Sequence, residues 1–104
     1  MNNKDIFYTA GFFDGDGHTS IGYGGRPEVR FTNNNKEILE YLKKLWGGNI
    51  YKQKNSNAYY LVIVKREDVL KTIETIYPHL IVRKLQAERV IEITNFLKDL
   101  KNKK

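Results

Sequence analysis

Residues 9–17, which read Thr-Ala-Gly-Phe-Phe-Asp-Gly-Asp-Gly, constrain the fold of this chain more than any other segment. Gly11 and Gly15 lie four residues apart, so on a helix they share one face that a second backbone can approach closely. Asp16 follows directly, between glycines whose carbonyls can coordinate a cation, so it is a candidate magnesium ligand. The alternative is that residues 14–17 are only a tight turn, because Asp and Gly dominate turns.

Charge and composition narrow the class of protein. The chain has 104 residues, enough for one domain, with 18 Lys and Arg residues against 12 Asp and Glu. A net charge of +6 favours a polyanionic partner. The absence of cysteine excludes disulfides and thiolate metal sites. No apolar run approaches the roughly 18 residues of a membrane span, so we expect a soluble, intracellular protein without membrane contact, in an organellar, bacterial, archaeal or phage host.

Hydrophobic periodicity predicts two helix–hairpin units and two final helices. Asn3 or Asp5 can cap a first helix, and from His18 the pattern alternates with a period of two through a turn at residues 24–27. A second helix ends at Gly47-Gly48, and residues 50–54 and 58–64 form a second hairpin. Pro78 closes a third helix, and the last begins near Lys84. We expect one domain over residues 1–97 and a frayed basic end over residues 98–104.

This order of elements predicts an α+β fold. Four antiparallel strands would pack helices against one face, and the other face would stay open and polar. Such a face can be simply solvated, so on its own it does not imply a partner.

The segment Thr9–Gly17 resembles the signature of the LAGLIDADG homing endonucleases. Ala10, Gly11, Asp14, Asp16 and Gly17 are identical to that signature, whereas Thr9 departs from Leu. The order of elements matches the family's αββαββα fold, and residues 59–70 and 77–87 look like its fourth strand with the helix that follows and the entry to its final helix. The resemblance therefore covers nearly the whole chain and implies a saddle-shaped sheet.

The chemistry implied by this resemblance is metal-dependent hydrolysis of DNA. Asp16 and the Gly15 carbonyl would bind Mg²⁺, for which Mn²⁺ can substitute, and the ion would activate a water. The family's water-positioning amide falls at Asn33 or its neighbour Asn34, and its basic residue falls at Arg83, an Arg in place of the usual Lys, or at Lys84. The expected catalytic residues are Asp16, Asn33, Arg83 and Lys84.

The resemblance also implies contacts with double-stranded DNA and with a second copy of the chain. The open face would lie in the major groove, where each base pair presents a distinct pattern of donors and acceptors. One signature per chain implies a homodimer that joins through Phe7, Gly11 and Gly15 and makes a double-strand cut in a near-palindromic site. The residues expected to contact DNA are Ser20, Arg26, Glu28, Arg30, Thr32, Lys52, Lys54 and Tyr60.

Two other functions fit the same fold: a non-catalytic DNA-binding regulator and an RNA maturase that assists an intron. Retention of Asp16, Gly15 and Asn33 favours the nuclease, because a protein that only binds has no need of a metal carboxylate. The resemblance therefore identifies the chain as a single-motif homing endonuclease of an intron or intein.

Overall fold

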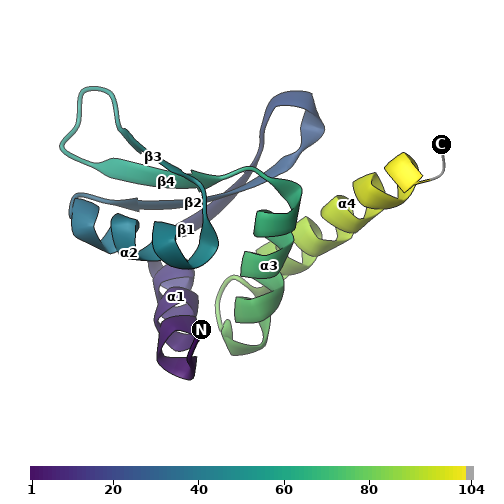
Figure 1. Ribbon diagram of the computed structural model, residues 1–104, viewed down its shortest axis with the longest axis horizontal. Helices are drawn as coiled ribbons and strands as arrows, with labels where there is room; N and C mark the ends of the chain where they lie inside the picture. Colours follow the sequence, from purple (N-terminus) through teal and green to yellow (C-terminus); the bar gives the residue numbers. More distant parts are fainter. Residues whose placement is uncertain (103–104) are drawn as a thin grey trace.

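A computed structural model describes residues 1–102 of the chain (Figure 1). The helices are α1 (Asn3–Asp16), α2 (Lys36–Trp46), α3 (Arg66–Ile76) and α4 (Lys84–Asn102), with short 3₁₀ turns η1 (Tyr23–Gly25) and η2 (Tyr77–His79). The strands are β1 (Gly17–Ile21), β2 (Pro27–Asn33), β3 (Asn49–Lys52) and β4 (Tyr59–Ile63). The predicted α+β order is confirmed.

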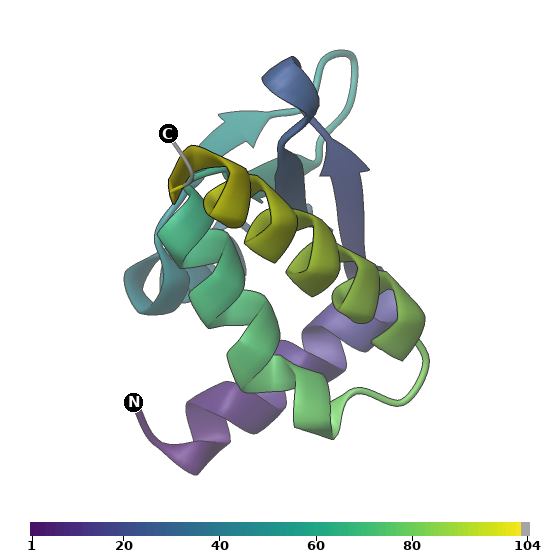
Figure 2. The same ribbon diagram turned by 90° about the vertical axis from the view of Figure 1, so that its right-hand side faces the viewer.

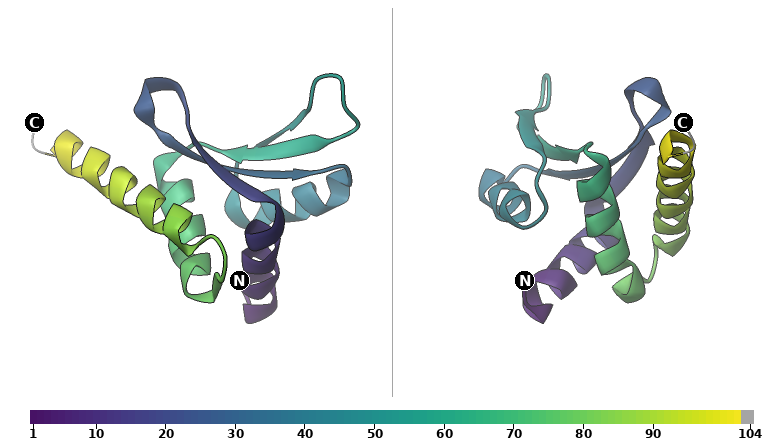
Figure 3. Two further views of the ribbon diagram at one scale, coloured as in Figure 1. Left: turned by 180° about the vertical axis from the view of Figure 1, so that it is seen from behind. Right: turned by 45° about the vertical axis from the view of Figure 1, so that its right-hand side comes forward.

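The four strands form one antiparallel sheet in the order β1-β2-β4-β3. All four helices lie against one face, and the two hairpins curve away from the helices on the other, which gives the sheet a saddle shape (Figure 3, left). Val29 and Phe31 of β2 and Leu61 and Ile63 of β4 alternate toward the helices and are fully buried. Burial of this one face fixes the strand register, because a slip of one residue would expose all four side chains.

Two caps define where α1 and α2 begin. Asn2 precedes α1 and forms a capping box with Asp5, so the cap lies one residue before the earlier of the two expected positions, Asn3 and Asp5. Asn35 caps α2 by accepting a hydrogen bond from the Glu37 N–H at 3.0 Å. Glycine at position 47, with φ of 90°, ends α2 as expected.

Thr9, the departure from the signature, joins α1 to α2. Its buried hydroxyl accepts a hydrogen bond from the Trp46 indole N–H at 3.0 Å and donates one to the Asp5 carbonyl at 2.8 Å. A Leu at position 9 would leave the buried indole N–H without this acceptor, so the departure is explained by packing against Trp46.

The last helix is longer than expected. α4 continues to Asn102, so the frayed end expected from Lys98 is helical through residue 102, and residues 103–104 lie outside the described part. Ala87, Val90 and Thr94 are buried at intervals of three and four residues, and this side of α4 packs beside α3 (Figure 2). None of the helices in residues 1–102 is long and apolar enough to cross a membrane.

Candidate functional site

The end of α1 and the end of β2 meet at one end of the sheet. β1 begins at Gly17 directly opposite Phe31, two residues before β2 ends at Asn33. Gly17 has to be glycine, because a Cβ there would lie 2.2 Å from the Phe13 ring and 2.7 Å from the Phe13 Cα. This close turn leaves Asp16 exposed at the point where the helix passes into the sheet.

Asp14 fixes the loop that leads into α4. Its carboxylate accepts hydrogen bonds from the backbone N–H groups of Ile81 at 2.7 Å, Val82 at 3.2 Å and Arg83 at 3.0 Å. A carboxylate that accepts several backbone N–H groups is held firmly in place. Asp14 therefore has a structural role, and Asp16 is left as the exposed carboxylate of the pair.

Arg83 lies at the C-terminal end of α1. Its Nε donates to the Asp14 carbonyl at 3.2 Å and its guanidinium reaches the Gly15 carbonyl at 3.5 Å. These carbonyls end the helix and carry the negative end of its dipole, so a cation there is stabilising. Of the two predicted basic residues, Arg83 is the one that contacts the residues just before Asp16. Lys84 instead places its ammonium 5.8 Å from the centre of the Tyr77 ring.

The amide of Asn33 is half-buried, and its Oδ1 accepts the Asn35 N–H at 2.8 Å. This turn leaves the Asn33 Nδ2 group as the available donor. Asn34 is exposed in the loop that follows.

The open face of the sheet carries a cluster of polar and aromatic side chains around Arg30. The Arg30 guanidinium lies 4.5 Å from the centre of the Tyr60 ring, and Arg30 Nη2 is 3.8 Å from Glu28 Oε1. Ser20 Oγ donates to the same Glu28 oxygen at 3.5 Å. Thr32 pairs with Tyr60 across β2 and β4, so it shares this face. The guanidinium of Arg30 therefore lies between the Tyr60 ring and the Glu28 carboxylate on the open face.

Three predicted DNA contacts lie elsewhere. Lys52 pairs with Tyr59, two residues from the Ile50–Leu61 pair that faces the helices, so the prediction that Lys52 points out from the open face is wrong. Lys54 lies in the turn after β3. Arg26 is exposed just before β2, beside the junction of β4 and α3.

Two residues of the open face were missed. His18 pairs with Arg30, and Tyr51 pairs with Tyr60 with ring centres 5.6 Å apart. The period of two already assigned His18 to the side of Ser20, so that signal was present in the sequence. No such signal was present for Tyr51, because an aromatic residue in a strand can lie on a buried face as readily as on an exposed one.

The outer surface of α1 is apolar and uncovered. A Cβ added to Gly11 or Gly15 would meet no atom of the described residues within 4 Å beyond its own helix, and Phe7, one turn before Gly11, is 53% exposed. Ile81 and Val82, held against the end of α1 by Asp14, are 85% and 75% exposed. Glycines that fill no space within the chain are free to meet a helix from outside it.

One chain supplies few metal ligands. Within residues 1–102 there is no group of three or more His, Asp or Glu side chains that could hold a metal ion. Asp16 and the Gly15 carbonyl nevertheless offer the oxygen ligands that Mg²⁺ and Ca²⁺ prefer. They fit a site that is completed by groups from outside this chain.

A family model for the LAGLIDADG-like domain matches residues 6–77, which include the signature, both hairpins and α3. This chain belongs to the LAGLIDADG-like domain family. The predicted family and its fold are thereby confirmed.

Solved LAGLIDADG structures share this fold over nearly the whole chain. An archaeal intron-encoded homing endonuclease, I-Vdi141I, complexed with DNA is 27% identical with a TM-score of 0.81, over 93% of this chain and 70% of that one. Homing endonuclease I-CvuI, in complex with its target in the presence of Ca, is 23% identical with a TM-score of 0.80, over 96% of this chain and 73% of that one.

A curated relative carries a different name. This chain is 38% identical to the intron-encoded RNA maturase bI4 of Saccharomyces cerevisiae in an alignment of 63 positions that covers 55% of this chain. The chain spans about a tenth of the length of that maturase, since the match covers 10% of it.

Proposed function

We propose that this chain is a homodimeric homing endonuclease that makes metal-dependent double-strand cuts in a near-palindromic DNA site. One observation carries the proposal: the exposed carboxylate of Asp16 lies at the end of a helix whose Gly11 and Gly15 surface is covered by none of residues 1–102. Two such helices crossing at their glycines would bring two Asp16 carboxylates together at the twofold axis. This pairing would add a second carboxylate to the site, and within residues 1–102 one chain offers no group of three or more such side chains that could hold a metal ion.

Asp16 and the Gly15 carbonyl would hold the divalent cation, Mg²⁺ or Mn²⁺. When bound, the cation lowers the pKa of a coordinated water and stabilises charge on the scissile phosphate. The Nδ2 group of Asn33 would orient the attacking water. Arg83, already beside the Gly15 carbonyl, would neutralise the phosphate, with Lys84 further out.

The open sheet face would read the bases. Arginine donates two hydrogen bonds to a guanine edge and glutamate accepts from a cytosine amino group, so Arg30 and Glu28 have the right chemistry for the major groove. Tyr60 supports the proposal because its ring holds the Arg30 guanidinium in place before any DNA arrives. The relatives crystallised with DNA carry the same fold.

The similarity to an RNA maturase supports a second candidate function. A maturase would use a basic surface for RNA and would not require the Asp16 carboxylate. A cleavage assay therefore separates the two functions.

The test is cleavage of a DNA library that contains the uninterrupted form of the host gene, with Mg²⁺ present. We expect the wild type to cut one site, and Asp16→Asn to bind that site and reduce cleavage at least about 100-fold. Asp99→Asn removes an exposed carboxylate from α4 as a matched control and should cut like the wild type. Binding without cleavage in Mg²⁺ and in Mn²⁺ would contradict the proposal and favour the regulator, and selective RNA binding would favour the maturase.

A further inference from the structure

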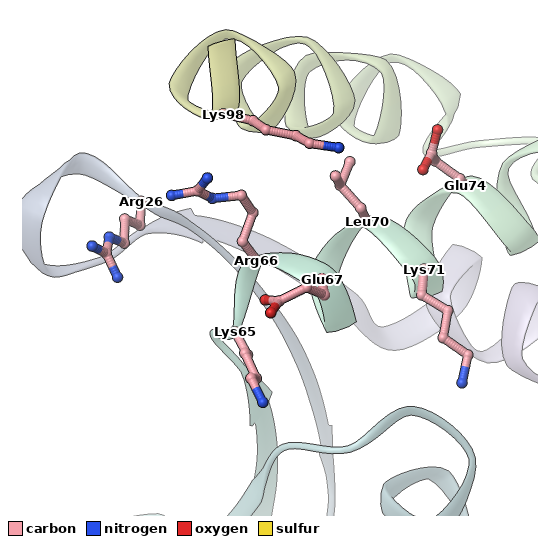
Figure 4. A pocket seen from close by; sticks show the side chains of 8 residues that line it. All are labelled: Arg26, Lys65, Arg66, Glu67, Leu70, Lys71, Glu74 and Lys98. Carbon is pink, nitrogen blue, oxygen red and sulfur yellow. The ribbon is translucent and has the colours of Figure 1, made fainter. Parts of the chain in front are cut away.

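A basic groove lies beyond the end of the sheet that is opposite Asp16. It has a volume of about 670 Å³ and opens where β4 passes into α3 (Figure 4). Arg26 comes from the first hairpin and Lys98 from α4, so three distant parts of the chain form it. The residues that line the groove are Arg26, Lys65, Arg66, Glu67, Leu70, Lys71, Glu74 and Lys98.

The strand register separates this groove from the proposed cleavage site. Pro27 at the start of β2 pairs with Ile21 at the end of β1, whereas Asn33 at the end of β2 lies beside the start of β1. β2 spans seven residues, or about 23 Å at roughly 3.3 Å per residue. The groove is therefore about one sheet length from Asp16.

The charges in the groove are unbalanced. Five of its residues are cationic and two are acidic, and none of the five forms an ion pair in the part of the chain that the structure describes. Figure 4 shows Lys98 pointing from α4 toward α3, and Lys65 and Lys71 pointing to the other side of α3. Clustering of like charges without partners costs electrostatic energy, which an anionic ligand would relieve.

Leu70 is the one apolar residue that lines the groove, and no aromatic ring does. Its three lysines act as point charges toward phosphate, and the guanidinium groups of Arg26 and Arg66 can each bind a phosphate through two hydrogen bonds. The chemistry therefore fits a sugar–phosphate backbone, and contacts to phosphate carry no direct sequence information.

We infer that this groove binds the DNA backbone beyond the base pairs that the sheet contacts, and so adds affinity that does not depend on sequence. This inference rests on the proposed DNA-binding function. It extends the contact with DNA past the end of the sheet, on the side away from the cut.

The experiment compares two double variants of equal charge. Lys65→Gln with Lys98→Gln removes two exposed lysines that line the groove, one just before α3 and one from α4, and Lys43→Gln with Lys44→Gln removes two exposed lysines from α2. Fluorescence anisotropy measures how tightly the wild type and each double variant bind a duplex of about 30 base pairs and mixed sequence, at KCl concentrations from low to physiological. Thermal unfolding of both variants verifies that they fold.

Each lost phosphate contact reduces the magnitude of the slope of log K against log salt concentration by about 0.9. We expect the groove variant to reduce the magnitude of this slope by about 2 and to bind at least about tenfold more weakly at physiological salt. The α2 variant should change the slope and the affinity much less. Equal slopes for the two variants would overturn the inference and leave the proposed function intact. A wild type that binds no duplex would refute both. A groove variant impaired only toward a single-stranded RNA of the same length would overturn the DNA assignment in favour of RNA.

Discussion

The carboxylate of Asp14 should contribute more to stability than any other surface acid of this chain whose bonds the structure describes. It accepts hydrogen bonds from the backbone N–H groups of three consecutive residues, 81–83, and so connects the end of α1 to the start of α4. We therefore predict that Asp14→Ala destabilises the fold and separates Arg83 from the signature helix.

Hydrogen bonds to a charged group contribute roughly 1.5–3 kcal/mol each. Ile81 and Val82 are exposed, so water can replace the carboxylate for two of the three donors, and only the Arg83 N–H is partly buried. We expect Asp14→Ala to cost about 2–4 kcal/mol. Asp14→Asn keeps one oxygen acceptor but turns an amide N–H₂ toward a backbone donor, so it should cost about 1–2 kcal/mol.

Urea unfolding measures these differences at one fixed protein concentration, because a dimer unfolds with concentration dependence. With a slope of about 2 kcal/mol per molar, Asp14→Ala should lower the urea midpoint by about 1–2 M. Asp99→Ala, which removes an exposed acid of α4, should stay within about 0.5 kcal/mol of the wild type. If Asp14→Ala costs no more than Asp99→Ala, the reasoning about the three bonds is refuted.

Three further predictions concern the dimer, the open face and alkaline pH. Gly11→Leu should keep two α1 helices apart, so sedimentation should give the 12.2 kDa monomer, and an unchanged dimer mass would contradict the interface. Tyr60→Leu should weaken discrimination at the base pair read by Arg30 by about 0.5–2 kcal/mol in a binding selection, whereas Tyr60→Phe, which keeps a ring, should not; equal effects would exclude the stacking role. The hydrogen bond to Asp5 raises the pKa of Tyr41 to about 12, so the stability that this bond contributes is complete below pH 10 and is lost as the pH rises from 10 to 12. Tyr41→Phe should therefore cost about 1 kcal/mol at pH 7 and should remove the alkaline loss of stability in a pH series of urea melts. A pH series that is the same in Tyr41→Phe and the wild type would count against the bond.

Local signals in the sequence were enough to predict most of the fold. Gly47 and Pro78 limit α2 and α3 through their own backbone restrictions, and the period of two assigned Val29 and Phe31 to the buried face. The same period excludes Lys52 from the open face, because Lys52 lies two residues after the inward-facing Ile50. The error came from giving the charge of Lys52 more weight than its position in the strand.

The contacts of the site could not be predicted in the same way. The bonds of Asp14 to residues 81–83 depend on how α1 and α4 pack, and no local pattern reports packing between segments so far apart. The resemblance assigned both Arg83 and Lys84 to the site, but only the tertiary fold separates Arg83, which contacts the end of α1, from Lys84, which lies over Tyr77.

Central to the proposed function is that two copies of Asp16 meet. The chain contains no cysteine, so Asp16→Cys introduces a single thiol whose position a short bis-maleimide crosslinker can report. We predict that Asp16→Cys forms a covalent dimer on a denaturing gel, and that Glu92→Cys, a thiol on the exposed side of α4, forms little or none. Failure of Asp16→Cys to crosslink, or equal crosslinking by Glu92→Cys, would contradict a site built from two Asp16 carboxylates.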